Sequence, residues 1–413
     1  MAKKEVMNMV RRDIYMNQLM KYKDSKLIKV ITGLRRCGKS TLLKMFEQDL
    51  MLSGVPHERI TNINFELMIY DDIRDYREFY SLLRGQIKSG SKHYLLLDEV
   101  QQVVGWEKAV NSLTVESDIA VDVYITGSNA HMLSSDISTL LSGRYVEIKM
   151  LPLSFKEFLL FEHLPTSWTT DEKFQQYLKY GSLPVVTTLP QDDLTINELL
   201  LGIYNTVVIK DIVARSNCKN VDLLERLMRY VIACTGNIVS PNKISGFLNS
   251  RSKGENVKSS TIATYLDILE KAFIVYQAPR YDIKGKEQLR TLSKYYVADT
   301  GIRNALMGYH GSDIGHVLET IVYFELLRRG YNVFIGKWYD NEVDFLAIRQ
   351  DVRKYYQVTL SLMDEKVRSR EFAPLVAIAD NYEKTVLSMD KTYLTNYEGI
   401  RFLNIIDFLL END

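Results

Sequence analysis

The stretch that decides the fold is Gly33-Leu34-Arg35-Arg36-Cys37-Gly38-Lys39-Ser40, with Thr41 directly after it. It matches the pattern G-x-x-x-x-G-K-[ST], in which two glycines let the backbone curl around a phosphate group. Residues 27–32 before it form an apolar, β-branched run that predicts a strand, and residues 41–50 after it carry an apolar stripe at helical spacing. Backbone N–H groups and the dipole of the helix N-terminus both favour a bound anion there. The stretch therefore predicts a phosphate-binding loop between a strand and a helix.

Each residue type in this loop has an expected task. The Lys39 ammonium is predicted to reach the β- and γ-phosphates of ATP, and the Ser40 hydroxyl to bind magnesium. Arg35 and Arg36 are unusually bulky for such a loop, and the pattern leaves open whether they contact phosphate or adenine or are exposed to solvent. The expected nucleotide-binding residues are Gly33, Leu34, Arg35, Arg36, Cys37, Gly38, Lys39, Ser40 and Thr41.

A second signal is the run Tyr94-Leu-Leu-Leu-Asp98-Glu99, an apolar strand that ends in two acids. Such a pair is weak evidence alone, since the acids can simply be solvated at a strand end. After a phosphate-binding loop it indicates that Asp98 holds the magnesium shell and that Glu99 polarises the attacking water. The two motifs together predict ATP and Mg²⁺ as cofactors.

Two further elements are candidates for contact with the γ-phosphate. The strand-like run 123–129 ends in Ser128 and Asn129, which suit either a contact with phosphate and water or an ordinary polar strand cap. Arg144, in Ser142-Gly-Arg144, suits either an arginine finger that reaches a neighbouring subunit or a salt-bridged surface residue. The expected catalytic residues are Lys39, Glu99, Asn129 and Arg144.

Strand and helix patterns alternate through the first part of the chain, which predicts a parallel sheet covered on both faces. The chain has 413 residues, enough for several domains. We expect an ATPase domain over 1–152, a helical region over 153–235, a winged-helix-like domain over 236–310 and an α/β domain over 311–413. The expected strands of the sheet are residues 27–32, 60–65, 94–98, 121–126 and 145–150, with helices over 41–50 and 79–87.

Composition narrows the class of protein. Lys+Arg and Asp+Glu both number 52, so the chain is not basic throughout, and 46% hydrophobic with 25% charged residues is ordinary for a globular protein. Three cysteines are too few and too scattered for a disulfide framework or structural zinc, and the six histidines show no metal-ligand spacing. We find no apolar signal core and no run of about 20 apolar residues. These features predict a soluble, cytoplasmic protein that does not enter membranes.

Residues 241–295 have a local excess of positive charge, with ten Lys or Arg against five Asp or Glu. The order of two helices followed by strand-like runs is typical of a winged helix-turn-helix. The segment could neutralise DNA or RNA phosphates, but an apolar helix face and a solvated charged face, or a protein-contact role, explain it equally. The candidate basic contacts are Lys258, Lys271, Arg280, Lys284, Lys286 and Arg290.

The motifs named so far resemble those of AAA+-type P-loop ATPases. The runs Leu141-Ser-Gly-Arg144, Leu151–Phe158, Tyr180-Gly-Ser-Leu-Pro184 and Tyr296–Ile302 extend the resemblance to a large prokaryotic family with a C-terminal domain of unknown function. The resemblance implies ATP binding and hydrolysis and hints at a ring-shaped homo-oligomer, although a monomer or dimer stays open. It implies no particular client.

The C-terminal domain resembles a restriction-endonuclease-like core, in which acids and an [E/Q]-x-K motif hold a divalent metal. Glu319, Asp344 and Gln357 fit the acidic positions, but Thr359 stands where the motif needs lysine. Thr359 cannot supply the positive charge, so nuclease activity is doubtful. We expect a degenerate domain used for binding or assembly.

The chain is therefore expected to have an α/β fold: a P-loop NTPase parallel sheet, helical and winged-helix-like segments, and the restriction-endonuclease-like domain. The expected function is a magnesium-dependent ATPase whose nucleotide state is coupled to C-terminal modules that contact nucleic acid or protein. The alternative is a nucleic-acid-binding module that uses ATP as a regulatory ligand with little turnover. A small-molecule kinase would need an acceptor pocket with its own base, and we find no residue for this beyond Glu99.

Overall fold

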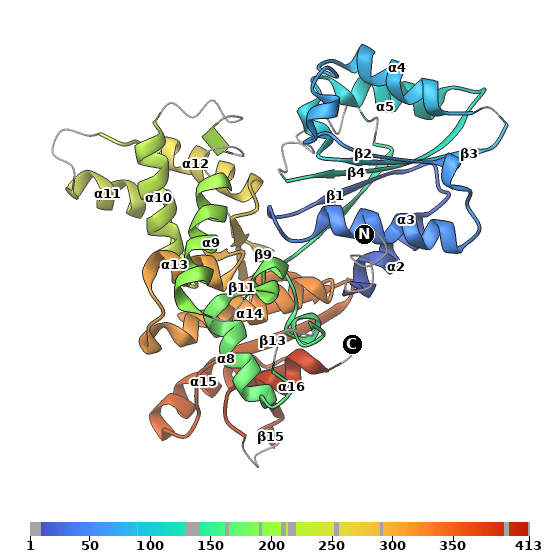
Figure 1. Ribbon diagram of the computed structural model, residues 1–413. Coiled ribbons are helices and arrows are strands. Elements are labelled where there is room, and N and C mark those ends of the chain that lie inside the picture. The colour runs from blue at the N-terminus through green and yellow to red at the C-terminus, as the bar shows by residue number, and fades with distance from the viewer. Residues whose placement is uncertain are drawn as a thin grey trace. The chain divides into compact units, whose positions relative to one another are not determined.

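The computed structural model divides the chain into two compact units (Figure 1). Unit 1 comprises Met1–Leu151 with Lys271–Phe273, and unit 2 comprises Pro152–Glu270 with Ile274–Asp413. The structure describes residues 10–88, 90–128, 141, 143–161, 165–189, 192–207, 212–213, 220–251, 256–289, 292–391 and 396–411.

Unit 1 is built on a five-stranded sheet of order β2-β3-β4-β1-β5, in which all neighbouring strands are parallel. The predicted parallel sheet is therefore confirmed. The carboxyl ends of β1, β3 and β4 meet at one edge, which is where open α/β sheets bind their ligands. The strands are β1 (Ile28–Thr32), β2 (Ile60–Asn64), β3 (Lys92–Asp98), β4 (Ala120–Gly127) and β5 (Tyr145–Lys149).

Helices cover both faces of this sheet (Figure 1). Val30 packs in the cluster with α4 and α5, whereas its neighbour Ile31 packs in the cluster with α2 and α3, as the alternation of strand side chains requires. The helices are α2 (Asp13–Tyr22), α3 (Lys39–Leu52), α4 (Tyr76–Gln86) and α5 (Trp106–Val115), with short 3₁₀ turns η2 (His57–Arg59), η3 (Met68–Tyr70) and η4 (Val100–Gln102).

Unit 2 begins with helices and a small antiparallel sheet of order β6-β10-β7. Two helices lie between β6 and β7 in the chain, as in the expected order of elements. The elements are α7 (Phe155–Phe158), α8 (Thr170–Tyr180), η6 (Pro184–Thr188), α9 (Asp193–Thr206), α10 (Val221–Ala233), β6 (Ile238–Val239), α11 (Pro241–Arg251), α12 (Ser259–Lys271), β7 (Val275–Ala278) and β10 (Ser293–Val297).

The rest of unit 2 is a mixed eight-stranded sheet of order β15-β16-β14-β13-β12-β11-β8-β9. After residue 360 the chain forms a helix, three short strands and a final helix. The strands are β8 (Arg280–Asp282), β9 (Glu287–Gln288), β11 (Asn332–Trp338), β12 (Asn341–Arg349), β13 (Val352–Val358), β14 (Glu383–Ser388), β15 (Asn396–Tyr397) and β16 (Ile400–Asn404), and the helices are α13 (Thr300–Met307), η8 (Gly311–Asp313), α14 (Ile314–Arg328), α15 (Glu365–Ala377) and α16 (Ile405–Leu410).

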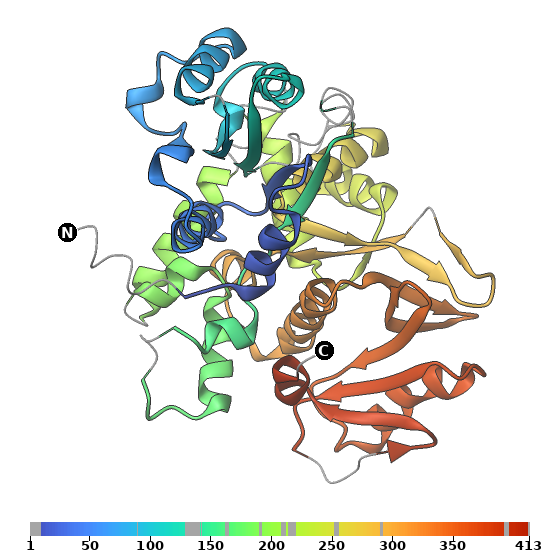
Figure 2. The same cartoon turned by 90° about the vertical axis from the view of Figure 1, so that its right-hand side faces the viewer.

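The hairpin of β8 and β9 was not predicted. Its strand β8 continues the direction of β7 and pairs in parallel with β11, so the hairpin joins the small sheet to the edge of the large one (Figure 2). The turn 283–286 at its tip is exposed at Lys284 and Lys286.

Two of the family-like motifs in unit 2 prove to pack against each other. The Asp299 carboxylate accepts hydrogen bonds from the Ser182 backbone N (2.6 Å) and hydroxyl (2.9 Å), and it caps α13 through the N of Ile302 (2.9 Å). A Cβ on Gly301 would lie 2.1 Å from the Tyr180 carbonyl oxygen. Burial raises the pKa of Asp299 above its ordinary value. These motifs therefore hold α8 against α13.

Within the described residues, no helix combines the length and the apolar character that crossing a bilayer requires.

Candidate functional site

The loop of residues 33–40 joins β1 to α3 and depends on glycine at both ends. Gly33 has φ +147° and Gly38 has φ +103°, values that L-residues rarely adopt. A Cβ on Gly33 would lie only 2.1 Å from the carbonyl oxygen of Met150. The pattern of two glycines thus has a direct steric reason.

Lys39 is the first residue of α3, and its side chain turns back into the loop. Its Nζ donates to the carbonyl oxygens of Gly33 (3.0 Å) and Leu34 (3.2 Å). The residue is 4% exposed, which is unusual for lysine. A buried ammonium held by backbone carbonyls is positioned for an anion in the same loop.

Asp98 ends β3 and lies beside the loop. It is 3% exposed, accepts a hydrogen bond from the Thr126 hydroxyl, and lies near the side chain of Ser40. Burial raises the pKa of Asp98, while the hydrogen bonds from Thr126 and Ser40 and the charge of Lys39 oppose the rise. The structure therefore brings together Lys39, Ser40 and Asp98, which lie up to 59 positions apart in the sequence.

Glu99 has the backbone angles φ 53° and ψ 41°, in the left-handed region. Its backbone N donates to the Thr126 hydroxyl oxygen (3.0 Å), and its Oε2 accepts from Ser128 (3.3 Å) and from the Gln101 amide. A non-glycine residue in this region costs of order 1–3 kcal/mol, and such strain concentrates at functional sites. Glu99 is thus held in a fixed orientation next to Asp98.

Thr126 and Gln101 were not predicted as site residues. The Thr126 hydroxyl lies between the acids, donating to Asp98 and accepting from the backbone of Glu99. The polar end of β4 was the available signal, but it pointed to Ser128 and to Asn129. Asn129 lies outside the described residues, so its predicted contact with phosphate stays a prediction.

The structure also places the three arginines whose roles were open. Arg35 pairs with Glu66 at 2.6 Å between Nη2 and Oε1, whereas Arg36 is exposed and has φ 69°. Arg144 is exposed, directly before β5. Its role as an arginine finger toward another subunit stays a prediction.

The N-terminal helix α2 supplies a support that the sequence analysis missed. Arg12, directly before this helix, is 5% exposed and donates from Nη1 to the carbonyl oxygens of Cys37 (3.1 Å) and Leu151 (2.9 Å). Its guanidinium also lies 4.7 Å from the ring of Tyr15, whose hydroxyl accepts from the Leu151 N at 2.9 Å. Arg12 therefore holds the phosphate loop in place through the backbone carbonyl of Cys37.

We expect Arg12→Met to weaken ATP binding about tenfold or more. A hydrogen bond from a charged donor is worth about 1.5–3 kcal/mol, and its loss frees the carbonyl at Cys37 to move. The measurement is titration of the full chain with a fluorescent ATP analogue. Arg11→Met is the matched control, since Arg11 pairs with Asp49 and does not touch the loop. Equal affinities for the two variants would remove this supporting role.

In unit 2 the predicted residues Glu319 (α14), Asp344 (β12) and Gln357 (β13) do come together. The Gln357 Oε1 accepts from the Asp344 backbone N (2.7 Å), and its Nε2 donates to Glu371 (3.0 Å). Thr359, in the position where lysine was expected, is 8% exposed. No cluster of three or more His, Cys, Asp or Glu suited to a metal ion occurs in the part of the chain that the structure describes.

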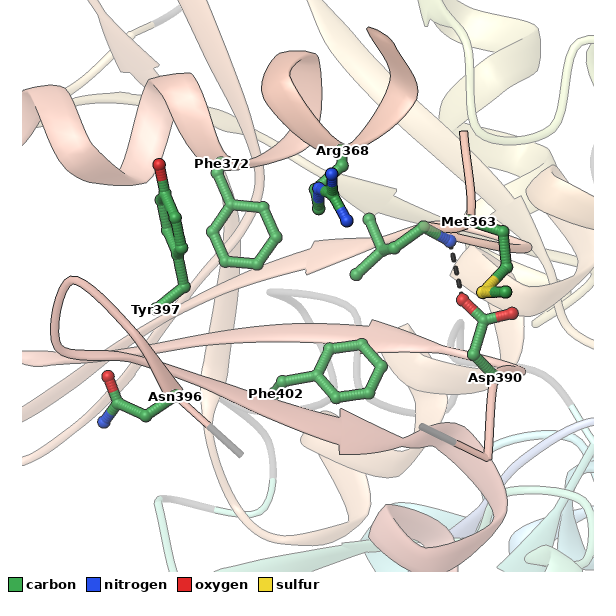
Figure 3. A pocket seen from close by; sticks show the side chains of 8 residues that line it. Met363, Arg368, Phe372, Asp390, Asn396, Tyr397 and Phe402 are labelled. Carbon is green, nitrogen blue, oxygen red and sulfur yellow. Dashed lines mark hydrogen bonds between the residues drawn. The ribbon is translucent and has the colours of Figure 1, made fainter. Parts of the chain in front are cut away.

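A small hollow in unit 2 is separate from both groups of residues (Figure 3). Phe372, Tyr397 and Phe402 form its apolar wall, and Asp390 accepts from the Leu362 backbone N at 2.6 Å. Its volume of about 50 Å³ is far below the several hundred Å³ that nucleotide-sized ligands need.

Comparison with known proteins agrees with this geometry. A family model described as an AAA domain matches residues 25–159, and one described as a domain of unknown function matches residues 171–313. An uncharacterized protein of Haemophilus influenzae is 40% identical over 407 residues, covering 98% of this chain and 99% of that protein. The uncharacterized protein MJ1544 of Methanocaldococcus jannaschii is 28% identical over 400 residues, covering 92% of this chain and 85% of that protein.

The chain therefore belongs to one family with the H. influenzae protein, and its first domain is an AAA-type P-loop ATPase domain. Among solved structures, a Walker-type ATPase of Pyrococcus abyssi is similar at 15% identity, with 73% of this chain and 96% of that chain covered and a TM-score of 0.49.

Proposed function

We propose that the chain is a magnesium-dependent ATPase whose nucleotide state is coupled to the modules of unit 2. The observation that carries the proposal is that Asp98 and Glu99 are both hydrogen-bonded to the Thr126 hydroxyl, with Lys39 and Ser40 of the loop beside Asp98. This arrangement supplies, at one sheet edge, the groups that phosphoryl transfer needs: a cation for phosphate, oxygen ligands for a metal and a carboxylate for water.

In this proposal the loop N–H groups and Lys39 hold the β- and γ-phosphates. Ser40 and Asp98 would hold Mg²⁺, which supplies charge neutralisation at the phosphates when it is bound. Glu99 orients the attacking water and accepts a proton from it as the general base. The Thr126 hydroxyl fixes the positions of both acids relative to each other, because it is hydrogen-bonded to the side chain of Asp98 and to the backbone of Glu99.

The direct test is phosphate release by the full chain in the presence of ATP and Mg²⁺, repeated with excess EDTA. We expect steady turnover that EDTA abolishes. Tight ATP binding without turnover would contradict the ATPase and would favour ATP as a regulatory ligand. Repeating the assay with DNA, with RNA and with a protein extract would identify the class of partner that stimulates it.

One observation favours nucleic acid as a partner of unit 2. Helices α11 and α12, followed by the antiparallel strands β7 and β10, have the order of a winged helix, and the exposed turn at Lys284 and Lys286 extends its hairpin. Lys284 also lies 4.4 Å from the ring of Tyr339. Basic side chains at the tip of a wing suit contact with phosphates of a nucleic-acid backbone.

We therefore expect the full chain to bind double-stranded DNA with an affinity that falls steeply as salt rises. Lys284→Glu and Lys286→Glu should each lower the slope of log affinity against log salt by about 1. Lys366→Glu, an exposed charge reversal on α15, is the control and should leave the slope unchanged. Absence of DNA binding at low salt, or equal slopes for all three variants, would rule this role out.

Assembly of copies through Arg144 belongs to the same proposal. The exposed guanidinium precedes the edge strand β5, from which it would complete the phosphate site of a neighbouring copy. Mixing Arg144→Ala with Lys39→Ala chains would then restore part of the turnover that each lacks alone.

A further inference from the structure

The acidic group in unit 2 contains a cation that does not come from the expected motif. Lys294, on β10, places its Nζ 3.2 Å from Glu319 Oε2, 3.0 Å from Glu342 Oε1 and 3.7 Å from Asp344 Oδ1. Its side chain is 5% exposed. One ammonium therefore faces three carboxylates from α14 and β12 in a nearly closed environment.

Other groups of the chain also lie against these carboxylates. The Tyr296 hydroxyl donates to Glu319 Oε2 (3.3 Å), and His316 Nδ1 lies 3.5 Å from Glu319 Oε1. The backbone N of Val358 donates to Asp344 Oδ2 at 2.9 Å. Glu319 and Asp344 thus each accept a further hydrogen bond from the chain beside the Lys294 ammonium.

The residues expected to hold a divalent metal do not fit one. The amide oxygen of Gln357 accepts from the backbone of Asp344, and its amide nitrogen points to Glu371, which also pairs with Arg370 at 2.6 Å. The amide oxygen is the one atom of the Gln357 side chain that could bind a hard cation, and it is already occupied by the backbone N–H of Asp344. The ammonium of Lys294 lies between the carboxylates of Glu319 and Asp344, where a shared metal ion would be expected.

We propose that Lys294 is the built-in cation of this cluster, replacing a divalent metal, and that the resulting ion network fastens β10 to the C-terminal sheet. The chain would then use the restriction-endonuclease-like arrangement as a structural joint and not for metal-dependent cleavage. This proposal is independent of the proposed ATPase, because all its residues lie in unit 2.

The electrostatics agree with a permanently charged lysine. Burial alone would lower the pKa of Lys294, but the carboxylates of Glu319, Asp344 and Glu342 outweigh burial and raise it above its ordinary value. Burial and the neighbouring Glu319 raise the pKa of Asp344 above its ordinary value, whereas the charge of Lys294 opposes this rise and helps to lower the pKa of Glu319. Removing one partner of a buried ion network leaves uncompensated charge and is strongly destabilising.

The first test is Mn²⁺ binding to the nucleotide-free full chain, measured by electron paramagnetic resonance of the free ion. We expect the wild type and Asp344→Asn to bind the same number of Mn²⁺ ions, because the cluster takes none. A Mn²⁺ ion that binds the wild type and is lost in Asp344→Asn would overturn the proposal.

The second test is thermal unfolding of the full chain. Lys294→Met should lower the melting temperature of unit 2 by about 6–12 °C, and adding Asp344→Asn should recover part of the loss because it removes one unpaired charge. The control is Lys354→Met, which removes a more exposed pair with Glu383 and should have a much smaller effect.

A Lys294→Met shift no larger than that of the control, or a double variant that shows only the sum of the two single shifts, would contradict the proposal. If Lys294→Met does not fold, restored folding of the double variant reports the same coupling. The Mn²⁺ comparison of wild type with Asp344→Asn decides the question even if neither Lys294 variant folds.

Discussion

Lys39→Ala is expected to lower the affinity for ATP by about 100-fold or more. The ammonium is buried inside the loop at 3.0 Å from the Gly33 carbonyl oxygen, where the phosphates are expected to bind. Two charge-assisted contacts with phosphate oxygens, each worth about 1.5–3 kcal/mol, account for the expected loss. The measurement is isothermal titration of the full chain with MgATP.

The matched control is Lys44→Ala on the same helix. Lys44 is exposed and lies one turn further along α3, away from the loop. It should bind MgATP as the wild type does. Wild-type affinity in Lys39→Ala would mean that ATP binds elsewhere, and the assignment of the loop would be wrong.

Glu99→Gln is expected to bind MgATP nearly normally but to hydrolyse it about 10²–10⁴ times more slowly. The amide keeps the shape and accepts the same hydrogen bonds from Ser128 and Gln101, but it cannot take a proton from water. The substitution therefore separates binding from chemistry. Phosphate release under single-turnover conditions measures the chemical step directly.

The control for Glu99→Gln is Glu116→Gln, at the end of α5, where the carboxylate pairs with Arg84. It should leave turnover unchanged. If Glu99→Gln hydrolysed ATP at the wild-type rate, Glu99 would not be the base, and the strained backbone at that residue would need another explanation.

The residues proposed to bind ATP could be grouped from the sequence largely because their signals are local. Gly33, Gly38 and Lys39 lie in one loop, and Asp98 follows a run of buried residues that can only be a central strand. Thr126 was missed because its value comes from the pairing of β4 next to β3, which brings its hydroxyl between the acids. In the sequence alone, a single threonine near a strand end does not indicate that its hydroxyl contacts two acids of another strand.

Unit 2 was predictable in part of its order of elements but not in its contacts. Lys294 lies on β10, 25 positions before Glu319 on α14, so the motif expected around Gln357 did not connect the two. The lysine position expected after Gln357 holds Thr359, and nothing in the sequence pointed from there to Lys294. The hairpin of β8 and β9 was also missed, because its strands are only three and two residues long.

The central claim is that the triphosphate of ATP binds the loop of residues 33–40 and that a metal joins it to Asp98. The most direct measurement is a crystal structure of the full chain with Mg²⁺ and a non-hydrolysable ATP analogue. The account predicts the γ-phosphate at Lys39 Nζ and the metal between Ser40 and Asp98, with Glu99 facing the γ-phosphate through a water molecule. A nucleotide bound away from this loop, or a metal coordinated without Ser40 and Asp98, would contradict it.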